Sequence, residues 1–200
     1  MKKRTKRKRF NIFDEYRKSW KYIKESKKFI YLVIVIFLLF FLLGFFIPTP
    51  EFLYDEIMKL IKELLEKTQN MSQLDLIGFI IYNNAKSSFL SIILGIFLGI
   101  FPILDAITNG YILGFVSSFS VGSGGFLSLW RILPHGIFEL PAIFISLGLG
   151  VKIGMFVFQK GKIKTFKNYL INSLKVFLLI VIPLLIIAGI IEGTLITLLK

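Results

Sequence analysis

Residues 29–47 read FIYLVIVIFLLFFLLGFFI, a run of nineteen residues without a charged side chain. An α-helix needs about 20 predominantly apolar residues to cross the hydrocarbon core of a bilayer. Pro48 and Pro50 follow directly, and proline cannot continue a regular helix. The run therefore predicts a membrane-spanning helix, and it decides the class of protein to which the rest of the chain belongs.

The composition of the whole chain indicates several such helices. The 200 residues are 55% hydrophobic with a mean hydropathy of +0.74, whereas soluble domains are about 45–50% apolar. The absence of cysteine excludes disulfides, thiolate metal ligands and cysteine nucleophiles. We predict an all-α integral membrane protein with about five transmembrane helices plus interfacial amphipathic helices. The spans are expected at 29–47, 85–101, 106–121, 134–158 and 170–196.

A basic arm precedes the first span. Residues 1–28 contain thirteen Lys or Arg and three acids. In front of an apolar run, such an arm favours attraction to anionic lipid headgroups, through residues 2–28, over binding to nucleic acid. Aromatic residues recur at helical spacing from Phe10 onwards, which predicts a helix lying in the membrane surface. We therefore divide the chain into a basic cytoplasmic arm with an interfacial helix (1–28) and a single transmembrane helical domain (29–200).

The segment after the first span is harder to divide. Residues 51–69 are amphipathic and predict a helix on the membrane or against the bundle. Residues 76–104 are largely apolar, but NNAKSS interrupts them at 83–88, and a straight helix of that length would extend about 43 Å. We therefore expect an interfacial piece ending near Tyr82, a separate span at 85–101 and a turn at 102–105.

Three pairs of glycines occur at four-residue spacing within the expected spans: Gly95/Gly99, Gly110/Gly114 and Gly150/Gly154. Small residues at this spacing let helix backbones approach closely in a membrane. The pairs predict close packing within one bundle, and the alternative is dimerisation.

The distribution of charge predicts an orientation. Cytoplasmic loops of membrane proteins carry an excess of Lys and Arg. With the basic arm inside, five spans place residues 159–168, which hold four lysines and no acid, inside as well. Residues 51–75 fall outside and hold six acids and three lysines. We therefore predict a multi-pass protein of the cell membrane with a cytoplasmic N-terminus and an extracytoplasmic C-terminus.

A few polar side chains lie within or beside the expected spans and need an explanation, because polar groups are costly in lipid and usually face the bundle interior. His135 and Glu139 are one helical turn apart on one helix face. Pro141 is expected to kink that helix and to free the carbonyl of Ile137. In the five-span topology, three segments bring polar groups to the outer ends of the second, fourth and fifth spans. We predict that these polar groups form a functional cluster. Its members are Asn83, Asn84, Arg131, His135, Glu139 and Glu192, and Asn109 is not assigned to it.

The same residues allow three chemical interpretations. His135, Glu139 and Glu192 supply one nitrogen and two carboxylates, which is enough for a catalytic zinc, although the spacing is not the H-E-x-x-H signature. A nucleophilic triad lacks the nucleophile-elbow motif. A hydrogen-bond network that holds helices together is the favoured interpretation. We therefore predict no catalytic residue and no cofactor, and we leave the question of a metal open.

Four stretches carry a resemblance to a known family. They are NNAKSSFLSIILGIFLGI (83–100), NGYILG (109–114), ILPHGIFELPAIFIS (132–146) and IIEGTLI (190–196). In order and content they resemble the stage II sporulation protein M family of polytopic membrane proteins. The resemblance implies a membrane component of a complex that remodels the cell wall during engulfment, in which partners carry the wall-degrading activity. Homologues in bacteria and archaea that never sporulate imply that the family is not tied to sporulation.

These observations lead to three functional hypotheses. The first is a non-enzymatic component or scaffold of a cell-envelope-associated complex, with a membrane-protein partner or a second copy of this chain. The second is a transport or channel component, which requires a polar path to Glu139 or Glu192. The third is a metal-dependent membrane hydrolase, which requires His135 and Glu139 to converge with a third ligand.

Overall fold

The computed structural model describes residues 11–125 and 133–198, and for residues 133–135 it describes the backbone only. Within these residues the chain is helical and contains no strand. The helices are α1 (Ile12–Glu25), α2 (Lys27–Phe46), α3 (Glu51–Thr68), α4 (Gln73–Leu94), α5 (Ile100–Gly124), α6 (Leu133–Gly154), α7 (Lys162–Val176) and α8 (Ile182–Leu198). A 3₁₀ turn, η2 (Met155–Phe158), and a π-helical turn, η3 (Phe177–Val181), complete them.

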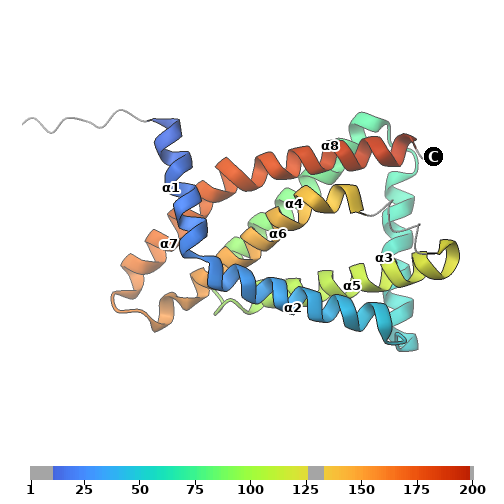
Figure 1. Cartoon of the computed structure of the whole chain (residues 1–200), viewed down its shortest axis with the longest axis horizontal. Coiled ribbons are helices and arrows are strands. Elements are labelled where there is room, and N and C mark those ends of the chain that lie inside the picture. Colours follow the sequence, from blue (N-terminus) through green and yellow to red (C-terminus); the bar gives the residue numbers. More distant parts are fainter. Residues whose placement is uncertain (1–10, 126–132, 199–200) are drawn as a thin grey trace, which may run out of the picture.

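The prediction of five spans is confirmed for the described part of the chain. Five helical segments there are long and apolar enough to cross a bilayer, namely Lys27–Phe46, Gln73–Leu94, Ile100–Gly124, Gly136–Phe158 and Lys162–Leu198. Figure 1 shows α2, α4, α5, α6 and α8 running along the long axis of the molecule. Helix α3 crosses one end of this bundle, and α1 and α7 lie at the other. We call these the α3 end and the α1 end.

Helix α6 is the centre of the bundle, in contact with α2, α4, α5 and α8. Its residues 146–154 are all buried, so neighbouring helices cover this part of α6 on every side, and Lys152 is the one charged residue in it. Leu147, Leu149 and Ile153 are at most 1% exposed. Because α6 fills the space between α4 and α5, these two consecutive helices touch each other far less than α2 touches α5.

Glycines bring the helix backbones together as predicted. A Cβ added at Gly95, directly after α4, would lie 2.2 Å from the carbonyl oxygen of Gly150 in α6. On α5, Gly110 and Gly114 lie equally close to the backbone of α2, at Phe37 and Phe41. Their interpretation as packing sites within one bundle is therefore confirmed.

The second span differs from the prediction. Helix α4 is continuous from Gln73 to Leu94, so the break expected at residues 83–88 and the span expected at 85–101 are wrong. The polar residues of NNAKSS do not interrupt the helix, because several of them face a pocket beside α6. The turn comes at residues 95–99 instead, where Leu98 and Gly99 adopt positive φ angles of 56° and 73°.

The last span also begins earlier than predicted. Residues Lys162–Leu198 form one long helical segment rather than a span starting at 170. The π-helical turn η3 ends two residues before Pro183. Proline lacks a backbone N–H and disturbs the turn that precedes it, and a π-turn is one way in which a helix adjusts to this.

Helix α1 packs against α7 at the α1 end of the bundle. Glu15 accepts hydrogen bonds from Lys175 (2.5 Å) and Lys18 (2.6 Å), and these bonds, Lys175 foremost, lower the pKa of Glu15 to about 2. Lys152 of α6 also reaches this region. Its ammonium donates to Ser26 Oγ at 2.9 Å and lies 3.7 Å from the centre of the Tyr22 ring.

Candidate functional site

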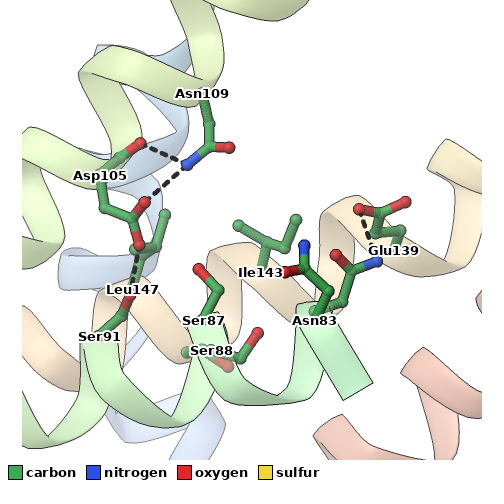
Figure 2. A pocket seen from close by; sticks show the side chains of 11 residues that line it. Asn83, Ser87, Ser88, Ser91, Asp105, Asn109, Glu139, Ile143 and Leu147 are labelled. Carbon is green, nitrogen blue, oxygen red and sulfur yellow. Dashed lines mark hydrogen bonds between the residues drawn. The ribbon is translucent and has the colours of Figure 1, made fainter. Parts of the chain in front are cut away.

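A polar pocket lies between α4, α5 and α6 (Figure 2), and it reaches the surface of the bundle at the exposed residues Asn83, Ser87 and Asn109. Its volume is about 90 Å³, which is room for roughly three water molecules. Of the lining side chains that the structure describes, Ile143 and Leu147 are apolar, and the others carry carboxyl, amide or hydroxyl groups. These polar residues are Asn83, Asn84, Ser87, Ser88, Ser91, Asp105, Asn109, Glu139 and Ser146.

The periodicity of α4 produces one wall of the pocket. Asn84, Ser88 and Ser91 follow one another at steps of four and three residues, so they share one face of the helix. Asn83 and Ser87 lie beside this face and also line the pocket. Short polar side chains leave space between α4 and its neighbours that leucine or isoleucine would fill. The pocket is therefore a direct consequence of the polar stretch in this helix.

Glu139 of α6 stands at one end of the pocket (Figure 2). The Asn84 side-chain amide donates a hydrogen bond of 3.0 Å to Glu139 Oε1. Glu192 of α8 interacts electrostatically with the Glu139 carboxyl. Because Gly193 packs against Ile77, Glu192 lies about 9 Å nearer the α3 end than Asn84 does, at 1.5 Å per residue.

Asp105 of α5 stands at the other end of the pocket. Its carboxylate accepts hydrogen bonds from the Ser91 hydroxyl and, at 2.7 Å, from the Asn109 side-chain amide. Ser91 is seven residues after Asn84 on α4, which places the two contacts about 10 Å apart along that helix. The carboxyls of Glu139 and Asp105 therefore face one cavity from different depths in the bundle.

The comparisons with known proteins place this fold in a family. The sequence pattern described as Stage II sporulation protein M matches residues 33–196. The chain belongs to the stage II sporulation protein M family. It is also 33% identical over 175 residues to an uncharacterized protein of Methanocaldococcus jannaschii, a match that covers 84% of this chain and 78% of that protein. No solved structure matches it.

In this member of the sporulation protein M family, the pocket unites part of the predicted polar cluster. Asn83, Asn84 and Glu139 line it together, and Glu192 is close enough to Glu139 to interact. Arg131 and the His135 side chain lie outside the described residues. The predicted depth of Asn83 and Asn84 was wrong. They were expected at the outer end of the second span, but in the continuous α4 they lie near the middle of the helix.

The pocket also contains residues that the sequence analysis did not assign to a cluster. Asp105 and Asn109 come from α5, and Ser87, Ser88, Ser91 and Ser146 complete the lining. The three- and four-residue spacing of polar residues after Asn83 is a signal that was available in the sequence. It was missed because those residues were assigned to a break between two helices.

The metal hypothesis stays a prediction. Among the residues whose side chains are described, no group of three His, Cys, Asp or Glu side chains is placed to hold a metal ion. The proposed ligand set of His135, Glu139 and Glu192 includes one side chain outside that description.

Proposed function

We propose that this family member is a non-enzymatic, multi-pass component of a cell-envelope-associated complex, and that a partner helix docks on α4. The observation that carries the proposal is the exposure of Lys86 on the surface of the bundle. Lys86 lies thirteen residues after Gln73 and eight before Leu94, so it is about 12 Å from the nearer end of the helix. That distance exceeds the reach of a lysine side chain, so its ammonium cannot leave the hydrocarbon simply by extending along the helix.

A charged side chain at this depth is expensive unless something covers it. Within residues 11–125 and the side chains described from 136 onwards, Lys86 forms no ion pair or hydrogen bond. The neighbouring Asn83 and Ser87 are exposed on the same part of α4. This combination fits a membrane helix of another protein that presents a carboxylate to Lys86, because pairing with an acid is how intramembrane lysines are usually compensated.

Site-specific cross-linking tests this partner. A photoreactive residue at position 86, in full-length protein isolated from its own cells, should give one discrete adduct with another membrane protein. The same residue at Leu39, an exposed apolar position on α2, should give none, because that surface suits lipid. Lys86→Leu should abolish co-purification of the partner without lowering the melting temperature in detergent.

Two results would refute the docking proposal. One is an equal yield of adducts from positions 86 and 39, and the other is an unchanged co-purifying set after Lys86→Leu. If the adduct contains a second copy of this chain, the partner on α4 is another copy of the same protein, and the complex is a dimer.

We further propose that the α1 end faces the cytoplasm. The support is the clustering of positive charge there, in residues 11–28 and 159–168, together with the position of α3 at the opposite end (Figure 1). Because the chain has no cysteine, a single cysteine at Lys162 should react with a membrane-impermeant maleimide only after the cells are opened. Reaction in intact cells would reverse the orientation.

A transport or channel component is the second candidate. It is favoured by the pocket between α4, α5 and α6, where Glu139 and Asp105 line a polar cavity instead of being enclosed by apolar side chains.

A further inference from the structure

We propose that the pocket between α4, α5 and α6 is a binding site for a small monovalent cation, either a proton held by water or Na⁺. The proposal goes beyond a role as a complex component and does not depend on it, because the site is built entirely from this chain. It rests on the charge balance of the pocket, on the chemistry of its lining and on one serine in its wall whose side chain forms no hydrogen bond to the described residues.

The charge balance calls for a cation. Glu139 and Asp105 both line the pocket, and among the described side chains its lining contains no lysine, arginine or histidine. The lysine at the α1 end of α6, Lys152, is instead bound to Ser26 and the Tyr22 ring. A carboxylate held in a membrane bundle is stable only when it is paired or neutralised. A proton or a metal cation in the pocket meets this requirement.

The lining has the chemistry of a site for a hard cation. Carboxylate, amide and hydroxyl oxygens surround the cavity, and these are the ligands that such ions prefer. Ser88 adds an independent indication. It is only 4% exposed and lines the pocket, and among the described residues its side chain forms no hydrogen bond. Its hydroxyl is not enclosed like those of Ser19 and Ser173, so it can bind a cation or a water molecule in the cavity.

The separation of the two carboxyls favours a monovalent cation at each carboxyl over one divalent ion shared between them. Glu139 is tied to Asn84, and Asp105 is tied to Ser91, about 10 Å further along α4. One divalent ion cannot contact both carboxyls across that distance at ordinary ligand distances of about 2.3–2.6 Å. Ser87 and Ser88 lie between the two positions on α4 and line the same cavity, so water in the cavity can connect them.

Among the described side chains, the other ionisable groups around Glu139 do not supply a positive charge. Glu192 approaches it from α8, and Asp105 shares its cavity from α5. The wall formed by α4 offers amides and hydroxyls. His135 is one turn earlier on α6, with its side chain outside the described residues. The described groups that face Glu139 are therefore carboxyls, amides and hydroxyls, and none of them carries a positive charge.

Modification by dicyclohexylcarbodiimide tests the site in the purified full-length protein. This apolar reagent adds to protonated carboxyls within membranes, and mass spectrometry of the peptides locates the product. We expect labelling at Glu139 or Asp105, identified by its loss in Glu139→Gln or Asp105→Asn. If the ligand is Na⁺, labelling should become about tenfold slower when Na⁺ reaches ten times its Kd, whereas choline at equal ionic strength should have no effect. If it is a proton, the rate should depend on pH and not on Na⁺.

A serine pair makes the test specific to the cavity. Ser88→Val fills the space beside the carboxyls and removes the hydroxyl. If the ligand is Na⁺, about ten times more Na⁺ should be needed for the same protection against labelling. If the ligand is a proton, the pH midpoint of labelling should shift by about one unit. Ser117→Val, at an equally buried serine of α5 outside the pocket, should leave both unchanged. Should Ser88→Val fail to fold, Ser88→Ala gives the same readout with a smaller side chain.

The cation site is refuted if neither carboxyl is labelled under any condition, or if labelling ignores both pH and Na⁺. It is equally refuted if the Ser88 variants titrate like the unmodified protein. Because these measurements need no partner, they fail or succeed independently of the cross-linking at Lys86.

Discussion

Gly114→Ala should destabilise the protein by about 2–3 kcal/mol, because overpacking a close helix contact forces the backbones apart. A Cβ at this position would lie 2.1 Å from the carbonyl oxygen of Phe41 and 3.0 Å from the amide nitrogen of Phe45. Both atoms belong to the backbone of α2 and cannot move without shifting that helix. In a chain of this size, the loss corresponds to a drop in melting temperature of about 5–10 °C, measurable by thermal unfolding in detergent.

Gly122→Ala is the matched control on the same helix. A Cβ there would meet nothing within 4 Å, and alanine is the better helix former. We expect a change within about 0.5 kcal/mol, as for most surface substitutions. If the two alanine variants unfold at the same temperature, α2 and α5 do not pack as described.

Lys152→Ala should cost about 2–3 kcal/mol, because it removes a charged hydrogen bond and a desolvated cation–π contact. Lys152 is 6% exposed, and besides Ser26 and Tyr22 its ammonium has the Tyr169 ring at 5.2 Å. Tyr22 belongs to α1, Ser26 joins α1 to α2, and Tyr169 belongs to α7. The substitution should therefore loosen α1 from the bundle and speed hydrogen exchange in that helix.

Two further variants separate charge from volume at this site. Lys152→Met keeps most of the side-chain volume and should lose less stability than alanine. Lys164→Ala removes an exposed lysine from α7 and should have little effect. Normal hydrogen exchange in α1 after Lys152→Ala would show that this lysine does not hold the helix in place.

The class of the protein was predictable because a span depends on local composition. The run at 29–47 contains enough apolar residues to cross a bilayer with no help from its neighbours. The five spans and the role of the glycine pairs follow from the same kind of local pattern. The boundaries of α4 do not, because the break inferred at residues 83–88 assumed that polar residues would face lipid or water. In the structure several of them face α6 and the pocket, and the helix continues.

The candidate site was predictable in part for the same reason. A polar side chain within an apolar stretch is visible in a sequence, and on that basis Asn84 and Glu139 were assigned to one cluster. Their hydrogen bond supports that assignment geometrically, while a function for the cluster stays a prediction. The contact between Ser91 and Asp105 joins two helices across the turn at residues 95–99. No local pattern reveals which faces of those helices meet.

The sequence determined that this chain is a helical membrane protein, because hydrophobicity and length are properties of each segment alone. Only the tertiary structure decided which polar groups share a cavity. The close contacts of Gly95 with Gly150, and of Gly110 and Gly114 with α2, set how each helix is rotated about its axis. Since each residue turns a helix by about 100°, that rotation decides whether Asn84, Asp105 and Glu139 point into lipid or toward one another.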